Sequence, residues 1–194
     1  TIMVNSFRPA IVMMALFTLL LGLAYPLAVT GIAQVAFPGQ ANGSLVRDAG
    51  GRVVGSALIG QPFAGATYLH PRPSAAGDGY DAAASSGSNL GPLNPDLAGR
   101  VAESAKAIRA EDGPGLIPAD AVTTSGSGLD PDVSPAYARL QAARIARARG
   151  VSVQQVQSII DSQTEGAFLG FIGQPHVNVL LTNRALDTRF GAEG

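Results

Sequence analysis

Residues 125–128 (Ser-Gly-Ser-Gly) contain the side chains of this sequence that are best suited to nucleophilic chemistry. A serine hydrolase needs a serine hydroxyl, a histidine base and a carboxylate that orients the base. His70, His176 and Asp130 offer the base and the carboxylate for Ser127. A nucleophile elbow, however, has glycine two residues before the serine, and here a second serine occupies that position. The segment is more typical of a hydrogen-bonded turn that leads into an Asp-Pro turn.

Other kinds of catalytic site find less support. The chain has no cysteine, and each histidine stands beside a proline, where we expect a loop residue with a single hydrogen bond rather than a metal ligand. Lys106 is the only lysine and lies between two alanines. This placement excludes both a phosphate-binding Gly-Lys-Ser/Thr loop and an Asp-Lys-Thr-Gly phosphorylation sequence. The chain therefore has no recognisable means of hydrolysing ATP.

A group of arginines without acidic neighbours follows Pro135: Arg139, Arg144, Arg147 and Arg149. On a helix these side chains could meet lipid phosphates or an acidic partner. No bulky apolar stripe accompanies them, and arginines near a helix C-terminus are favoured by the helix dipole. The pattern therefore favours a solvated helix face.

Composition limits the class of protein. The chain has 194 residues and a formal net charge of −1, which argues against a nucleic-acid partner. The absence of cysteine excludes disulfides. About 150 residues remain outside the long apolar segment described next, and this is enough for one domain with a core of its own.

Residues 9–46 carry no Asp, Glu, Lys or Arg. The apolar part is longer than the 7–15 residues of a cleavable signal peptide and long enough to cross a bilayer. We therefore predict an uncleaved transmembrane helix at residues 10–36. Arg8 precedes it, so the positive-inside rule predicts a short cytoplasmic N-terminus at residues 1–9 and an extracytoplasmic domain at residues 37–194.

Two features of the predicted helix bear on its partners. Pro26 removes one helical hydrogen bond and predicts a kink near Tyr25. Ala24, Ala28 and Gly31 follow one another at i, i+4 and i+7, so they share a face on which another helix could approach closely. The alternative is that alanine and glycine are simply common in membrane helices.

The remaining residues predict one domain of the α/β or α+β class. Residues 45–47 and 52–54 suggest a hairpin, residues 63–69 a short extended piece, and residues 74–92, rich in glycine and serine, a long surface loop. Start and stop signals then predict three helices, a buried strand and a short closing helix. These five elements are expected at residues 95–110, 135–149, 153–160, 177–181 and 184–190.

Five irregular stretches together resemble one known family. They are residues 25–31 (Tyr-Pro-Leu-Ala-Val-Thr-Gly), 68–74 (Tyr-Leu-His-Pro-Arg-Pro-Ser), 86–92 (Ser-Gly-Ser-Asn-Leu-Gly-Pro), 122–131 (Val-Thr-Thr-Ser-Gly-Ser-Gly-Leu-Asp-Pro) and 178–183 (Asn-Val-Leu-Leu-Thr-Asn). From the predicted anchor to Leu186, the chain resembles the C subunit of the Kdp-type potassium-transporting ATPase of bacteria. Leu69 and Leu93 depart from it, because the family usually has phenylalanine and threonine there.

The resemblance implies a non-catalytic subunit of the inner membrane, in contact with lipid. Its implied partners are a channel-like subunit that binds potassium and a P-type ATPase subunit. ATP and potassium are then handled by the complex, and no cofactor is assigned to this chain. The family's C subunit is described as a catalytic chaperone that raises the ATP affinity of the ATPase subunit.

The family resemblance also marks residues for a partner or nucleotide contact: Thr123, Thr124, Ser125, Ser127 and Asp130. Direct contact with cytoplasmic ATP would need a topology opposite to the one predicted above, so assembly of the complex is the favoured role. Two alternatives of other classes stay open, namely a membrane-anchored exported serine hydrolase and a free-standing anchored binding protein.

Overall fold

The computed structural model describes residues 2–48 and 50–191, and the chain forms two compact units, Thr1–Ser56 and Ala57–Gly194. The first contains a long helical run and a small hairpin. The second contains five helices and a small sheet.

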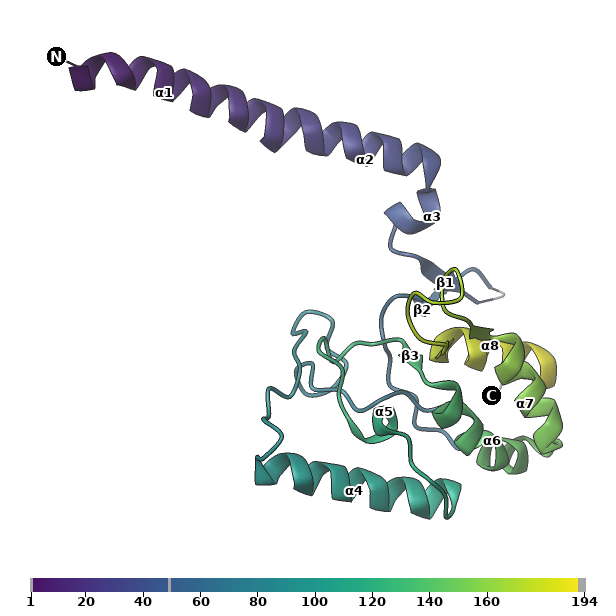
Figure 1. Cartoon of the computed structure of the whole chain (residues 1–194). Coiled ribbons are helices and arrows are strands. Elements are labelled where there is room, and N and C mark those ends of the chain that lie inside the picture. The colour runs from purple at the N-terminus through teal and green to yellow at the C-terminus, as the bar shows by residue number, and fades with distance from the viewer. Residues whose placement is uncertain (1, 49, 192–194) are drawn as a thin grey trace. The chain divides into compact units, whose positions relative to one another are not determined.

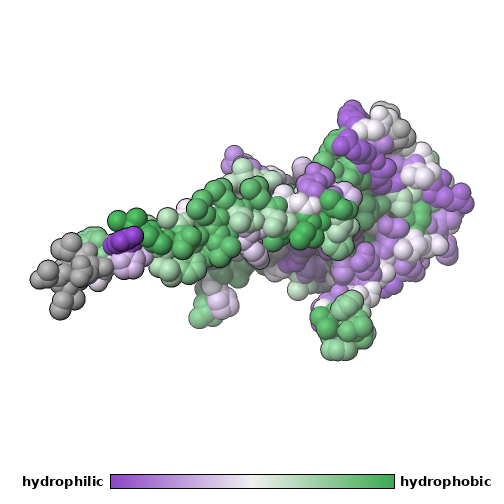
Figure 2. Space-filling model, turned by 90° about the horizontal axis from the view of Figure 1, so that it is seen from above, coloured by the Kyte–Doolittle hydropathy of each residue, from purple (hydrophilic) through white to green (hydrophobic). Residues whose placement is uncertain are grey.

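The helical run of the first unit consists of α1 (Ile2–Leu19), a π-helical turn (Leu20–Ala24) and α2 (Tyr25–Ala36) (Figure 1). Within it, Ser6–Ala36 is long and apolar enough to cross a membrane. Figure 2 shows hydrophobic side chains along most of this run, whereas the visible surface of the second unit mixes polar and apolar residues. The single candidate membrane span is therefore confirmed by length and composition.

The predicted disturbance near Tyr25 takes the form of the π-helical turn. The backbone N–H of Tyr25 donates to the carbonyl of Leu20, five residues earlier, and Pro26 follows directly. A proline ring clashes with the carbonyl four residues before it, so a wider turn at this place makes room for the ring. Pro26 therefore lies within a continuous helical run and does not end it.

The first unit closes with α3 (Pro38–Ala41) and the predicted hairpin, formed by β1 (Leu45–Arg47) and β2 (Val53–Ser56). The strands pair antiparallel, with an irregularity between Val46 and Arg47. Asp48 accepts hydrogen bonds from the backbone N–H and the guanidinium of Arg52, and the backbone bond is the largest cause that lowers the pKa of Asp48.

The second unit combines helices with three short strands. Its elements are α4 (Pro95–Asp112), α5 (Ala119–Val122), β3 (Asp132–Val133), α6 (Pro135–Arg149), α7 (Val153–Ser162), β4 (Thr164–Glu165), β5 (His176–Asn178) and α8 (Val179–Phe190). The strands form one antiparallel sheet in the order β3-β5-β4. The predicted mixed fold is confirmed, and the antiparallel pairing makes it α+β.

Local signals correctly predict where α4, α6 and α7 begin. Asn94 and Ser134 accept hydrogen bonds from backbone N–H groups of the first turns of α4 and α6. Ser152 and Gln155 form a complete capping box at α7. Gly150 ends α6 in the left-handed conformation, at φ 66°. Each signal acts within a few residues, which is why the sequence alone reveals it.

The predicted strand at residues 177–181 is confirmed only at its first two residues, and the predicted extended piece at residues 63–69 is wrong. The strand expected at residues 177–181 stops at Asn178, whose side chain accepts a hydrogen bond from the N–H of Leu181 and caps α8. Residues 63–69 form no regular strand. His176, expected in a loop, begins β5.

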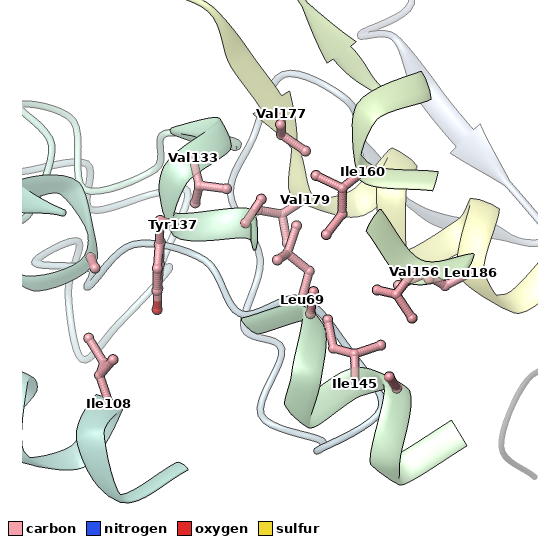
Figure 3. Packing of buried hydrophobic residues seen from close by; sticks show 14 residues of the cluster. Leu69, Ile108, Val133, Tyr137, Ile145, Val156, Ile160, Val177, Val179 and Leu186 are labelled. Carbon is pink, nitrogen blue, oxygen red and sulfur yellow. The ribbon is translucent and has the colours of Figure 1, made fainter. Parts of the chain in front are cut away.

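The core of the second unit lies where α6, α7, α8 and β5 meet (Figure 3). Its fully buried apolar side chains include Leu69, Ile145, Val156, Ile160, Val177 and Leu186. Leu69 comes from an irregular segment, although it is as deeply buried as the residues of the helices. Groups other than those of a neighbouring strand must therefore form hydrogen bonds with the backbone N–H and C=O groups around Leu69.

Two side-chain amides supply these hydrogen bonds. Asn183 Oδ1 accepts from the N–H of Leu69 at 2.7 Å, and Asn183 Nδ2 donates to the carbonyl of Leu69 at 2.9 Å. Gln141 does the same for His70, at 2.7 and 3.1 Å. Residues 65–70, here named the clamped segment, are thus held by α6 and α8 as a neighbouring strand would hold them.

The predicted solvated arginine face is wrong at two positions. Arg144, whose side chain is 7% exposed, pairs at 2.8 Å with Asp112, whose side chain is 2% exposed, and donates to several carbonyls of the clamped segment. Arg149 pairs at 2.7 Å with Asp187 and lies over the ring of Tyr68. These two arginines therefore fasten the clamped segment to α6.

The remaining two arginines of the group fit the prediction better. Arg139 pairs with Asp161 at 2.7 Å, and both side chains are more than half exposed. Arg147 is exposed. An exposed pair of this kind contributes about 0–1 kcal/mol to stability.

We predict that Gln141→Leu destabilises the second unit strongly. The leucine leaves the N–H and carbonyl of His70 without their partners, and each such group costs about 1–3 kcal/mol when it is buried. Gln154→Leu is the matched control, because Gln154 is exposed on α7. Thermal unfolding of the full chain, followed by circular dichroism, should show a lower midpoint for Gln141→Leu alone. Equal midpoints for the two variants would contradict the clamp.

Candidate functional site

The conspicuous glycine- and serine-rich sequences lie on two loops, residues 72–92 and 122–130, here named the first loop and the second loop. A salt bridge joins them, with Arg72 Nη1 at 2.7 Å from Asp130 Oδ2. Arg72 also donates to the carbonyl of Thr124 at 3.4 Å. Asp130, a candidate orienter of a catalytic histidine, is instead the partner of an arginine.

Hydrogen bonds around Ser74 extend this connection. Its hydroxyl donates to the carbonyl of Gly128 at 2.6 Å and accepts from the N–H groups of Ala76 and Tyr80. Tyr80 in turn donates its hydroxyl to the carbonyl of Arg72 at 2.6 Å. Burial raises the pKa of Tyr80 to about 12, so the phenol remains a donor at neutral pH.

The backbones of the two loops touch at Gly128. This residue has φ +68°, and a Cβ atom there would lie 2.5 Å from the carbonyl oxygen of Ser86 and 2.7 Å from the nitrogen of Ala76. The N–H of Ser86 donates to the carbonyl of Ser127 at 3.0 Å. The first loop is therefore an ordered surface loop that interlocks with the second, and glycine permits the close approach.

Thr123 and Thr124 lie at the start of the second loop. Thr123 directly follows α5, and its hydroxyl donates to the carbonyl of Ala119, the first residue of that helix, at 2.7 Å. Both threonines line a hollow of about 30 Å³ together with Ser88 and Arg100. That volume holds about one water molecule, whereas a nucleotide is many times larger.

Ser125, Ser127 and Asp130 form the predicted pair of turns. The two serine hydroxyl oxygens are 3.3 Å apart, and Ser127 Oγ accepts from the N–H of Leu129 at 3.1 Å. Asp130 Oδ1 accepts from the N–H of Asp132 at 3.0 Å. The structure thus brings all five candidate residues together. Most of their polar atoms form hydrogen bonds with the two loops or with α5.

The two histidines are engaged elsewhere. His70 Nε2 lies 3.0 Å from the carbonyl oxygen of Gly65, and Nδ1 lies 3.5 Å from Glu111. Burial, and then the Arg144 charge, lower the pKa of His70, which keeps the ring neutral at pH 7. His176 Nδ1 lies 3.1 Å from the carbonyl oxygen of Gln174. Within the described residues no hydrogen bond joins a histidine to a serine of the second loop.

A wider open hollow of about 280 Å³ lies beside His70. Phe63, Tyr80, Glu111 and Tyr137 contribute to its walls, and burial raises the pKa of Tyr137 above its ordinary value. Among residues 2–48 and 50–191 there is no group of three or more His, Asp or Glu side chains placed to hold a metal ion. The hollow therefore presents aromatic rings, carboxyl groups and the His70 ring.

Sequence reasoning located the second loop and missed its partners. Arg72 and Ser74 belong to the first loop and make side-chain bonds that hold the two loops together, and Tyr80 supports Arg72 from within the first loop. The sequence gives no local sign of this pairing, because the bonded residues lie about 40–60 positions apart along the chain. Their position beside prolines and glycines is the only available hint.

We predict that Gly128→Ala separates the two loops. An alanine there is strained at φ +68° and must displace backbone atoms of the first loop, which costs at least about 1–3 kcal/mol. Gly126→Ala is the matched control, because no heavy atom lies within 4 Å of its added Cβ. Amide hydrogen exchange at Ser86 should accelerate in the first variant alone. Unchanged exchange in Gly128→Ala would contradict the interlocked loops.

Comparison with known proteins agrees with the resemblance of the motifs. The sequence model of the family described as "K+-transporting ATPase, c chain" matches residues 7–188. A protein of Caulobacter sp. (strain K31) named "Potassium-transporting ATPase KdpC subunit" is 67% identical over 192 residues, 99% of this chain and 98% of the relative. Proteins of the same name are 64% identical in Beijerinckia indica (97% of this chain, 96% of the relative) and 56% identical in Mycobacterium tuberculosis (92% and 96%). The chain therefore belongs to the C-chain family of the K+-transporting ATPase, as an accessory subunit.

Proposed function

We propose that this chain supports the assembly of an ATP-driven potassium uptake complex without supplying a catalytic group. Its proposed partners are a channel-like potassium-binding membrane subunit and a P-type ATPase subunit. The near full-length match to relatives named as potassium-transporting ATPase subunits carries the proposal. The geometry supports it, because the hydroxyls of the second loop bond within their own turns instead of meeting a histidine base.

The chain further acts as a catalytic chaperone that raises the ATP affinity of the ATPase subunit. This effect is indirect in our proposal and passes through contacts between subunits. The small volume beside Thr123 and Thr124 supports an indirect effect, since it could not admit a nucleotide. Exposed polar groups of the second loop, such as Ser127, are then contacts for a partner protein.

The membrane helix contributes a packing surface in this proposal. Ala24, Ala28 and Gly31 share one face of the run, and no heavy atom lies within 4 Å of a Cβ placed on Gly31. Small residues allow two helices to approach closely in a membrane, where van der Waals contact replaces the hydrophobic effect as the attraction. This face is proposed to receive a helix of a partner subunit.

The orientation follows from charge. Residues 1–9 contain Arg8 and are proposed to lie in the cytoplasm, and residues 10–36 span the inner membrane. Residues 37–194 are then extracytoplasmic. This arrangement separates the second unit from cytoplasmic ATP, which is a further reason for an indirect effect on ATP affinity.

We predict that Gly31→Leu lowers the yield of the complex purified from detergent, because a large side chain holds the partner helix away. Gly22→Leu is the matched control, because it adds the same bulk to the same helical run at a position outside the group Ala24, Ala28 and Gly31.

Ser127→Ala should leave both yield and potassium-stimulated ATP hydrolysis nearly intact, with at most about 1–2 kcal/mol lost from one hydrogen bond. Removal of the whole chain should abolish that hydrolysis.

Four results would each overturn a part of this proposal. An intact complex without turnover in Ser127→Ala would assign the serine a direct role, and labelling of Ser127 by a fluorophosphonate would revive the hydrolase hypothesis. An equal yield from Gly31→Leu and Gly22→Leu would mean that the small-residue face meets lipid. A chain recovered from native membranes without partner subunits would favour the free-standing binding protein.

The orientation is tested with single cysteines, since the natural chain has none. A membrane-impermeant maleimide added to intact spheroplasts should label Leu93→Cys, whose side chain is exposed, and leave Ser6→Cys unlabelled until lysis. The reverse pattern would place the second unit in the cytoplasm and restore direct contact with ATP as a candidate.

A further inference from the structure

The loop between β4 and β5 exposes a concentrated apolar surface. Phe168, Leu169, Phe171 and Ile172 are between 50% and 77% exposed. Residues 167–173, which contain these four side chains and the small residues between and beside them, are here named the apolar tip. No Asp, Glu, Lys, Arg or His occurs from position 166 to 175. Exposed large apolar side chains gathered in this way mark a contact surface.

Backbone hydrogen bonds hold the apolar tip in a defined turn. Phe168 and Ile172 exchange two backbone hydrogen bonds, at 2.8 and 2.9 Å, and the N–H of Gly170 donates to the carbonyl of Ala167. Leu169 has φ 53°, a left-handed conformation that a glycine would adopt at lower cost. The turn therefore carries a leucine side chain at its end despite backbone strain.

The base of this hairpin is fixed in the core. β5 is the central strand of the sheet, and its Val177 is fully buried. β4 pairs with β5 through Thr164 opposite Val177 and Glu165 opposite His176. The core and the sheet thus hold the base of the hairpin in place. Glu165 is the last charged residue before the apolar tip.

Other exposed leucines of the second unit lack these properties. Leu93 and Leu116 are 96% and 97% exposed, but neither belongs to a comparable apolar group in the sequence. Scattered single apolar residues are normal on protein surfaces. Among the described residues of the second unit, Leu58 and Ile59 form an exposed pair, whereas the apolar tip gathers four exposed large apolar side chains within five residues.

The short connection between the candidate membrane span and the second unit favours a membrane as that contact surface. The candidate span ends at Ala36 and the second unit begins at Ala57, so about 20 residues connect them and reach at most roughly 70 Å when fully extended. Folding of α3 and the β1–β2 hairpin within this connection shortens it further. A bilayer surface is therefore always close to the second unit and acts at a high effective concentration.

We propose that the apolar tip inserts into the lipid interface of the membrane that holds the anchor, as a second membrane contact of this chain. Phenylalanine and leucine favour the boundary between headgroups and acyl chains. The tip has no charged side chain to desolvate and no polar side chain from position 166 to 173, whereas a specific protein interface surrounds its apolar centre with a polar rim. Lipid fits this composition better than a protein surface does.

Leu169→Cys, labelled with the fluorophore NBD, tests the insertion. The full chain is placed in lipid nanodiscs that contain lipids with a nitroxide near the top of the acyl chain, because interfacial segments enter about 5–10 Å. The label should lose most of its fluorescence to the lipid nitroxide and resist quenching by aqueous iodide. Leu116→Cys is the matched control and should respond in the opposite way.

A second set of variants links the result to the apolar side chains. Phe168→Ser with Phe171→Ser, in the Leu169→Cys background, should restore quenching by iodide. Phe171→Cys repeats the measurement at a second place, and circular dichroism confirms that each variant is folded. Labels at 169 and 171 that respond to iodide like the label at 116 would overturn the proposal. A label shielded from both quenchers would also overturn it, because protein would then cover the tip.

Discussion

A buried guanidinium is the constraint on which the second unit depends. Arg144 is nearly removed from solvent, so its donors must all find acceptors within the protein. It meets the carboxylate of Asp112 at the end of α4, the amide oxygen of Gln141, and the carbonyls of the clamped segment. One side chain on α6 thereby fixes the position of another helix and of an irregular segment. Loss of either charge would leave its partner unpaired in the core, which costs about 3–5 kcal/mol.

Side chains, more than strands, organise the backbone of this unit. The sheet has only short strands, whereas Gln141 and Asn183 hold the clamped segment, and Arg72 and Ser74 join the two loops. Ser, Gly and Asn residues in such numbers suggest flexibility by composition. Here they make specific hydrogen bonds and close contacts, so a glycine- and serine-rich sequence forms a defined surface. Such a surface suits recognition by partner subunits, and within the part of the chain that the structure describes its serine hydroxyls bond to no histidine.

Elements fixed by neighbouring residues can be predicted from this sequence, whereas contacts between distant residues cannot. Ser134, Ser152 and Gly150 act within one helical turn, and the helices that they begin and end were predicted correctly. The sequence extends the predicted strand to residues 179–181 because the capping role of Asn178 depends on where β5 ends. It predicts solvated arginines on α6 because Asp112 and Asp187 are separated from Arg144 and Arg149 by more than 30 residues. The turns of the second loop are local, so the sequence predicts them. The contacts that the first loop makes with the second join distant residues, so the sequence does not predict them.

The π-helical turn before Pro26 has a consequence for the register of the membrane helix. A π turn accommodates one more residue than an α turn, so it displaces the helix that follows by one position, or about 100°. The stripes of side chains on α1 and α2 are therefore out of phase with one another. A neighbouring helix that follows one stripe of α2 meets a different side of α1 beyond the turn. Deleting a single residue between positions 20 and 24 would bring the stripes back into phase and change which sequence positions form one continuous face.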